Sequence, residues 1–238
     1  MLSLERQSVL REEYRQKNPG WRPATEVYAD LVRAQMQADS RVLDLGCGRG
    51  GLVEQLKHPL RQVVGLDPDW LSLREHRLDL PRTAATSEHL PFAEKSFDVV
   101  FASWVLEHLP RPLVTFRAVN RVLKLGGAFV FITPNGRHPL TWLNRGLGRF
   151  ARLQERLVPW FYGRGRDDTF STFYRANSPA RLQQLSRASN FELSALHAIP
   201  DPTYLAFNRG LFYLMCRLES WLPAERKLHL VGMLKRKT

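Results

Sequence analysis

Cysteine is almost absent from this chain of 238 residues, which contains only Cys47 and Cys216. Two isolated thiols provide neither the ligand spacing of a metal site nor the disulfide framework of a small secreted domain. Cys47 lies in a glycine-rich stretch and Cys216 in an apolar one. We therefore expect no metal, and neither thiol suggests a covalent mechanism.

Long apolar runs are also missing. Residues 1–13 are charged throughout and lack the apolar centre of an export signal, so we expect a cytoplasmic protein. The apolar segment 203–222 is too polar to span a bilayer comfortably, because it is interrupted by residues such as Arg217 and Glu219. As a helix it could lie on a membrane surface, pack onto a sheet or meet a partner subunit.

Acidic residues are scarce in the C-terminal part of the chain. The whole chain has 35 basic and 23 acidic residues, and residues 137–238 contain 17 and 7 of these. The remainder has 18 basic and 16 acidic residues and is therefore nearly neutral. A strongly basic surface attracts the phosphates of lipids or nucleic acids, although a merely solvated, arginine-rich surface has the same composition.

One short stretch, in contrast, concentrates glycine. Residues 42–51 read V-L-D-L-G-C-G-R-G-G, an apolar run that carries Asp44 and ends in clustered glycines. Glycine lets the backbone turn sharply and leaves room for a ligand against the bare main chain. A strand that ends this way and leads into a helix is typical of a nucleotide-binding βα turn. The spacing Gly46-x-Gly48-x-x-Gly51 also matches the dinucleotide fingerprint, so the glycines alone do not identify the cofactor.

A second apolar run, residues 62–67, ends in Asp67, 19 residues after Gly48. A carboxylate at the tip of a second strand can accept hydrogen bonds from both ribose hydroxyls. NAD-dependent enzymes and adenosyl-sulfonium enzymes both need such an acid.

Further motifs follow in a fixed order: S-E-H-L-P-F at 87–92, S-F-D-V-V at 96–100, L-E-H-L at 106–109, V-L-K-L-G-G at 122–127 and T-P-N at 133–135. Their order and spacing resemble those of the class I S-adenosylmethionine (SAM) methyltransferases, in particular the small-molecule branch that includes the ubiquinone and menaquinone biosynthesis enzymes. The resemblance covers residues 41–135 closely. It implies an α/β, Rossmann-like, doubly wound sheet of seven mostly parallel strands in the order 3-2-1-4-5-7-6, with an antiparallel last strand, and SAM as the cofactor.

Apolar spacing, turn residues and this resemblance together predict a single methyltransferase domain of four parts. These are N-terminal helices (1–40), a SAM-binding core (41–135), a helical substrate-lid insertion (136–176) and a C-terminal part of the sheet with a helix at 203–222 (177–238). A helix is expected to start near Gly51, and another to cover 69–77.

The resemblance also implies where the cofactor binds. Asp44 would bind the amino group of the methionine portion. The full set of expected cofactor contacts is Asp44, Gly46, Cys47, Gly48, Asp67, Pro68, Ser87, Glu88 and Ser103. Thr86 departs from the family, which usually has an aspartate there for the adenine amino group. Because a hydroxyl gives only a weaker, uncharged hydrogen bond, either the backbone near Ser87 and Glu88 holds the adenine or the affinity is reduced.

Residues 136–176 are rich in aromatic and arginine side chains, and we interpret them as a lid over the substrate. The expected substrate contacts are Trp104, Tyr162 and Tyr174. This composition favours an apolar or amphipathic acceptor with negative charge, such as a lipid-linked intermediate or a quinone-like ring.

Methyl transfer from a sulfonium mainly needs alignment and exclusion of water, because the leaving group is already activated. An amine or thiolate acceptor needs little more, whereas a hydroxyl needs a base within hydrogen-bond reach. His138 is the first candidate for this base and His108 the second, although both also fit a structural role. We expect O-methylation of a small or lipid-like acceptor.

Three other functions stay open on the sequence alone. Thr86 and the unassigned base also fit a non-catalytic SAM-binding or scaffold protein. An NAD-dependent oxidoreductase would need a hydride-transfer site, and the sequence has no Tyr-x-x-x-Lys pair. The basic C-terminal part fits an RNA methyltransferase, but the Asn-Pro-Pro-Tyr-type and Pro-Cys motifs of base methylation are absent, so nucleic acid is the less expected partner.

Overall fold

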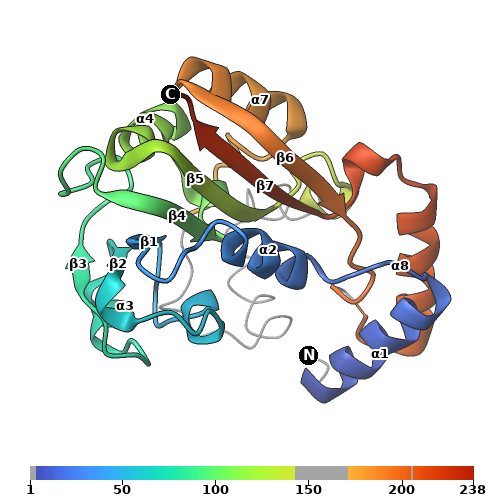
Figure 1. The fold of residues 1–238 in the computed structure, drawn as a ribbon. Coiled ribbons are helices and arrows are strands. Elements are labelled where there is room, and N and C mark those ends of the chain that lie inside the picture. Colours follow the sequence, from blue (N-terminus) through green and yellow to red (C-terminus); the bar gives the residue numbers. More distant parts are fainter. Residues whose placement is uncertain (1–3, 143–170, 205) are drawn as a thin grey trace.

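A computed structural model describes residues 4–142, 171–204 and 206–238. In these residues seven strands form one sheet in the order β3-β2-β1-β4-β5-β7-β6, which confirms the predicted order (Figure 1). The strands are β1 (Val42–Leu45), β2 (Val63–Asp67), β3 (Arg82–Ala84), β4 (Phe97–Ser103), β5 (Leu123–Pro134), β6 (Phe191–Ile199) and β7 (His229–Arg236). The first five are parallel, and β7 is antiparallel to both of its neighbours, β5 and β6.

Helices cover both faces of this sheet. The helices of the described residues are α1 (Leu4–Lys17), α2 (Ala24–Arg33), α3 (Trp70–Arg74), α4 (Pro112–Val122), α7 (Pro179–Ala188) and α8 (Arg209–Trp221), with short 3-10 helices η1 (Leu52–Gln55), η2 (Leu60–Gln62), η3 (Leu106–His108) and η5 (Ala224–Arg226). Helix α2 packs on one face, and α4 and α7 pack on the other (Figure 1). The central strands are buried on both sides, which explains why their sequences are apolar throughout instead of alternating.

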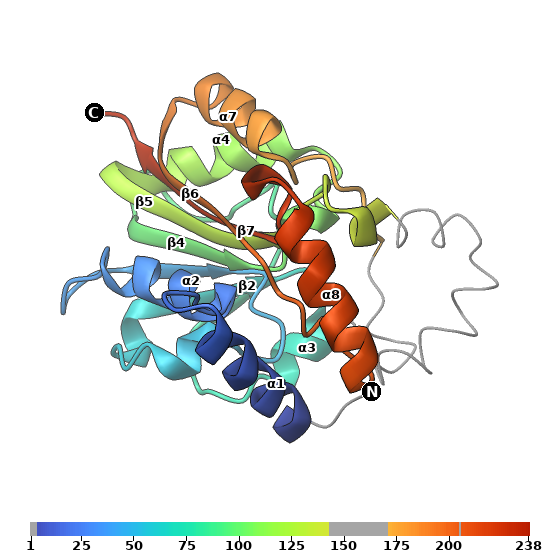
Figure 2. The same cartoon turned by 90° about the vertical axis from the view of Figure 1, so that its right-hand side faces the viewer.

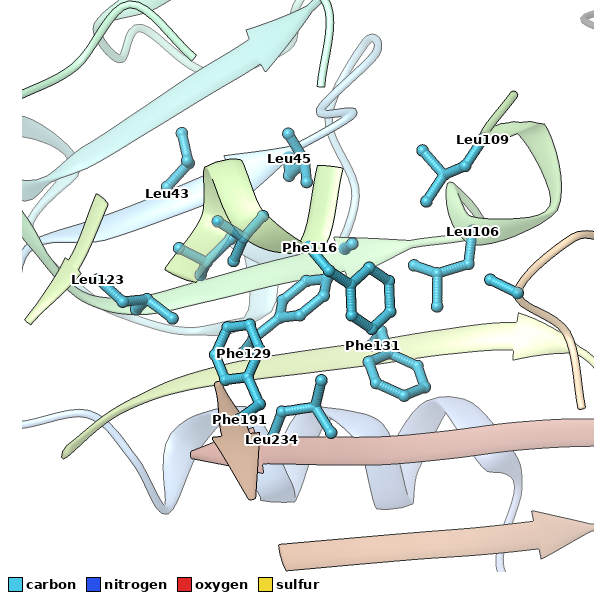
Figure 3. Close-up of a cluster of buried hydrophobic side chains, with 14 of the residues drawn as sticks. Leu43, Leu45, Leu106, Leu109, Phe116, Leu123, Phe129, Phe131, Phe191 and Leu234 are labelled. Atoms are coloured by element: carbon cyan, nitrogen blue, oxygen red, sulfur yellow. The ribbon is translucent and has the colours of Figure 1, made fainter. Parts of the chain in front are cut away.

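The larger core lies between the sheet and α4 with α7. Four fully buried phenylalanines occupy its centre, Phe116 from α4, Phe129 and Phe131 from β5 and Phe191 from β6 (Figure 3). The rings of Phe116 and Phe129 meet edge to face with centroids 5.6 Å apart, a favourable aromatic geometry. This core fixes the carboxyl ends of β4 and β5, where functional residues are expected.

Helices α1 and α8 lie side by side (Figure 2). Phe212 of α8 is buried against Leu10 and Tyr14 of α1. The helix expected over 203–222 is shorter in the structure, because α8 starts only at Arg209. The side chain of Asn208 caps this end by accepting a hydrogen bond from Leu211 N at 2.8 Å.

The helix expected to start near Gly51 is also absent from the described structure. Only the 3-10 helix η1 forms there, and Lys57 takes a positive φ of 53° soon after it. Glycine and proline both disfavour helices, and clustered glycines precede η1 while Pro59 follows it. The next helix, α3, is shorter than expected as well, with Asp69 as its N-cap and its last residue at Arg74.

Candidate functional site

The glycine turn after β1 is tied to the neighbouring strand by its backbone. Gly46 N and Cys47 N both donate to the carbonyl oxygen of Leu66, at 2.7 and 3.1 Å. Gly46 has a φ of +75°, and a Cβ atom at this position would lie 2.3 Å from Cγ2 of Val105. Only glycine fits both the backbone conformation and this close approach. Burial raises the pKa of the Cys47 thiol, which makes it a poor nucleophile.

Asp67 closes the turn from the tip of β2. Its Oδ2 accepts from Gly48 N at 2.9 Å, and its Oδ1 accepts at 2.9 Å from the N of Asp69, the residue that follows Pro68. Burial raises the pKa of Asp67, although these two hydrogen bonds oppose the shift. Each carboxylate oxygen has a further lone pair, so the group can still accept ribose hydroxyls.

Asp44 lies beside it at the end of β1 and is only 3% exposed. Among the described residues, no hydrogen-bond donor reaches its carboxyl group. Burial, with a smaller contribution from the charge of Asp67, raises the pKa of Asp44 to about 8. An isolated buried carboxylate is costly, so this position suits a ligand that brings a cation. The ammonium group of the methionine portion of SAM fits that requirement.

Ser103 ends β4 on the other side of Asp44. Its hydroxyl donates to the hydroxyl oxygen of Tyr28 at 3.0 Å. Tyr28 is buried, and burial raises its pKa well above the ordinary value; the hydrogen bond to Ser103 opposes this shift and the charge of Asp44 adds to it. The structure thus brings Asp44, Ser103 and Tyr28 together at the carboxyl ends of β1 and β4.

The residues expected near the adenine make contacts of their own. Ser87 Oγ lies 3.1 Å from Thr115 Oγ1, and Glu88 forms an ion pair with Arg111. Thr86 is exposed, and its Oγ1 lies 3.4 Å from His89 Nδ1. Among the described residues Glu88 Oε1 has no hydrogen-bond partner, so this oxygen and the backbone of Ser87 and Glu88 are the parts left to hold a base.

The expected lid returns to the fold at the carboxyl ends of β4 and β5. Phe173 N and Tyr174 N both donate to the carbonyl oxygen of Glu107, at 2.7 and 3.1 Å. Asn177 Nδ2 donates to Thr133 Oγ1 at 2.5 Å, and Thr133 Oγ1 donates to Glu107 Oε2 at 2.9 Å. This buried network anchors the C-terminal end of the insertion beside the cofactor residues.

Three other expected site residues belong to the insertion or lie next to it. Tyr162 lies outside the described residues. His108 Nδ1 is 3.0 Å from the carbonyl oxygen of Ser171, next to the returning segment. His138 is fully buried, with its Nδ1 accepting from Leu140 N at 3.2 Å.

Two residues that sequence reasoning missed lie next to expected ones. Nε2 of His138 is 3.5 Å from Oε1 of Glu219 on α8. The ring of Trp104 meets the ring of His229 edge to face, with centroids 5.0 Å apart. Glu219 and His229 are far from the recognised motifs in sequence, and no local signal marks them.

Comparison with known proteins finds related methyltransferases. Residues 43–131 match the model of a methyltransferase domain family, so this part of the chain is similar to the class I SAM-dependent methyltransferases. Among curated proteins, it is 35% identical over 104 residues to the malonyl-[acyl-carrier protein] O-methyltransferase of Legionella pneumophila, covering 40% of this chain and 37% of that one. It is 34% identical over 129 residues to the ubiquinone biosynthesis O-methyltransferase of Yersinia pestis, covering 51% and 52%. The chain thus spans about half or less of these relatives.

A solved structure extends the likeness to the fold. A geranyl diphosphate methyltransferase in complex with SAM has a TM-score of 0.61 at 12% identity, covering 89% of this chain and 84% of that one. Enzymes of this family use SAM. Among the described residues, no group of histidine, cysteine and acidic side chains could hold a metal ion, and no helix is long and apolar enough to cross a membrane.

Proposed function

We propose that this protein transfers the methyl group of SAM to an oxygen of a small or lipid-like acceptor. The observation that carries the proposal is the pair of buried carboxyl groups at the ends of β1 and β2, one of them without a hydrogen-bond donor among the described residues. When bound, SAM supplies a methyl group already activated by its sulfonium.

Each part of the cofactor has a matching residue in this proposal. Asp44 binds the ammonium group, Asp67 binds the ribose hydroxyls, and the turn from Gly46 to Gly48 leaves the backbone open to the ligand. Ser103 lines the methionine end. The adenine rests against the backbone near Ser87 and Glu88, which compensates for the uncharged Thr86.

The acceptor enters from the side of Trp104 and Tyr174, with residues 136–176, including Tyr162, acting as the lid. Oxygen as the acceptor atom is supported by the names of both curated relatives, which are O-methyltransferases. A lipid-like acceptor is supported by the aromatic and arginine content of the insertion and by the structural likeness to an enzyme named for geranyl diphosphate.

The outer face of α8 supports contact with a membrane surface. Leu214 and Trp221 are 58% and 73% exposed there. The guanidinium of Arg217 lies over the Trp221 ring, 4.9 Å from its centroid. Exposed apolar side chains beside a cation are typical of helices that lie on anionic lipid, and a protein placed there would meet a lipid-like acceptor directly.

Calorimetry and labelling test the function together. We expect SAM and S-adenosylhomocysteine to bind, and methyl-labelled SAM to label a component of a host lipid or metabolite extract. The variant Asp44→Ala should lose both, whereas Asp98→Ala, at the opposite end of β4, should keep both. SAM binding without transfer to any extract would favour a scaffold protein. Transfer to RNA alone, lost at high salt, would favour the RNA methyltransferase.

Vesicle sedimentation tests the membrane contact separately. Vesicles of phosphatidylcholine with phosphatidylglycerol should bind the protein, and the double variant L214A/W221A should bind much less. The control L125A removes another exposed apolar side chain, on β5 and away from α8, and should bind like the native protein. Equal binding of all three proteins would contradict the contact.

A further inference from the structure

A second group of buried polar side chains lies at the same edge of the sheet as the cofactor residues. His229 starts β7, where it pairs with Pro134 at the end of β5 and with Ile199 at the end of β6. His138 follows β5, and Glu219 reaches this place from α8. His138 is fully buried, Glu219 is 2% exposed and His229 is 6% exposed.

These side chains form a connected cluster. His138 Nε2 lies 3.5 Å from Glu219 Oε1, which also accepts from Asp201 N at 3.3 Å. Asp201 is held in turn by Thr203, whose N and Oγ1 both donate to its Oδ1, and by Arg11 at 3.6 Å. Because Leu140 N donates to Nδ1 of His138, the proton of a neutral His138 ring is on Nε2, facing Glu219.

Trp104 connects this cluster to the cofactor residues. Its neighbour in sequence, Ser103, bonds to Tyr28 beside Asp44. Trp104 itself has a positive φ of 59°, a strained conformation for this residue, and presents its ring to His229. His229 therefore lies directly beside the aromatic side chain expected to contact the acceptor.

A purely structural role explains this cluster poorly. Burying acids and histidines costs free energy, and apolar residues of similar size usually fill such a place at lower cost. Burial lowers the pKa of His229, while Asp201 and Glu219 raise it and His138 and Arg11 lower it. A neutral histidine is able to accept a proton at neutral pH. Among the described residues, neither of its ring nitrogens has a hydrogen-bond partner.

Building on the methyl transfer proposed above, we propose that His229 accepts the proton of the acceptor hydroxyl, and that His138 and Glu219 are positioning residues behind it. In this step the acceptor O–H bond breaks and its proton passes to a ring nitrogen of His229. The acceptor oxygen bonds to the methyl carbon, and the carbon–sulfur bond breaks with its electron pair remaining on sulfur. The proton then leaves to water, and no other reactant is needed.

This assignment moves the direct role from His138 to His229. His138 was the first candidate in the sequence because it follows the fifth strand. In the structure it is sealed from solvent and faces Glu219. It acts through its neighbours instead of touching the acceptor.

Three variants test the proposal with labelled SAM and the host extract as the probe. In H229N the rate of labelling should fall by about 100-fold or more, and the acidic limb of its pH profile should be lost. The SAM affinity of H229N, measured by calorimetry, should stay within about twofold of that of the native protein. H138N should lower the rate less and shift the acidic limb. The control H197N alters an exposed histidine of the adjacent strand β6 and should behave like the native protein.

A measurement without acceptor supplements these rates. Labelled-histidine NMR, with His229 assigned by its missing signal in H229N or H229Q, gives its titration curve. E219Q removes a negative charge that raises the pKa of His229, so this pKa should fall further. An unchanged titration in E219Q would overturn the positioning role, and full activity in H229N would overturn the direct role. A native protein that binds no SAM would instead overturn the proposed function, and this inference with it.

Discussion

The backbone N–H of Gly48 donates to Oδ2 of Asp67 at 2.9 Å, although the two residues belong to different βα units. This hydrogen bond joins the glycine turn after β1 to the tip of β2. One carboxylate therefore both holds the turn in shape and offers its remaining lone pairs to a ribose. We expect these residues together to form the cofactor site, so the loss of either should lower the cofactor affinity.

Replacing Asp67 with alanine should weaken SAM binding by about 10- to 100-fold, because one charge-assisted hydrogen bond contributes about 1.5–3 kcal/mol. The loss includes both the ribose contacts and the support of the turn. Calorimetric titration with SAM measures the change. Asp98→Ala serves as the control, since Asp98 accepts from Arg41 N at the amino end of β4, away from the glycine turn. Equal affinities of D67A and the native protein would contradict a ribose-binding role.

Cofactor affinity should depend on pH through Asp44, whose pKa is raised to about 8 by burial. An ammonium group binds the ionised form, so below pH 8 binding must remove a proton from this carboxyl group. We expect the affinity for S-adenosylhomocysteine to rise by up to about tenfold per pH unit between pH 6 and 8 and then to level off. Calorimetry in phosphate and in Tris gives the number of protons released. A flat affinity over this range would refute the prediction.

The same group should lower the stability of the ligand-free protein as pH rises. Folded Asp44 keeps its proton up to about pH 8, whereas the unfolded chain loses it near pH 4. The unfolded state therefore binds fewer protons in between, and the free energy of unfolding decreases from pH 4 to pH 8. In D44N this contribution should vanish, so the stability difference between variant and native protein should grow in favour of D44N over this range. Urea unfolding at a series of pH values measures it.

The parts of the fold that follow from local chemistry could be predicted from the sequence. An apolar run before the glycines identified β1, and an acid at the end of the next apolar run identified the tip of β2. Clustered glycines identified the turn. These signals are local, because burial on both faces and a sharp turn each restrict neighbouring residues directly.

The remaining features depend on contacts between distant segments. The start of α8 at Arg209 depends on a cap by Asn208, whereas apolar residues continue on its N-terminal side. Glu219 comes close to His138 only when α8 packs against α1. His229 contacts Trp104 only when β7 pairs with β5. Periodicity and motif order carry no information about such long-range contacts, so the cluster of buried histidines and acids could not be predicted from the sequence.

Replacing Gly46 with alanine should reduce cofactor affinity more than it reduces stability. The new Cβ atom would lie 2.3 Å from Cγ2 of Val105, so the turn must move away from Val105. We expect at least a tenfold weaker binding of SAM, about 1.4 kcal/mol, with partial recovery in the double variant G46A/V105A. Calorimetry and thermal unfolding of both variants separate the two effects. Recovery of neither property in the double variant would show that Val105 is not the obstacle.

Gly232 of β7 faces Phe131 of β5 across a ladder pair, and this contact should control stability without affecting the cofactor. A Cβ atom at position 232 would lie 2.4 Å from Cζ of the Phe131 ring, which is itself fully buried in the core. Gly232→Val should therefore destabilise the protein by about 1–3 kcal/mol through overpacking. Shortening the opposing side chain makes room, so the destabilisation in G232V/F131L should be smaller than the sum of the two single variants. Urea unfolding of the native protein, the two single variants and the double variant measures these free energies. Additive effects of the two substitutions would show that the contact between residues 232 and 131 is not the source of the destabilisation. SAM affinity of the folded variants should stay native, because the contact lies on the far side of β5 from the glycine turn in the strand order.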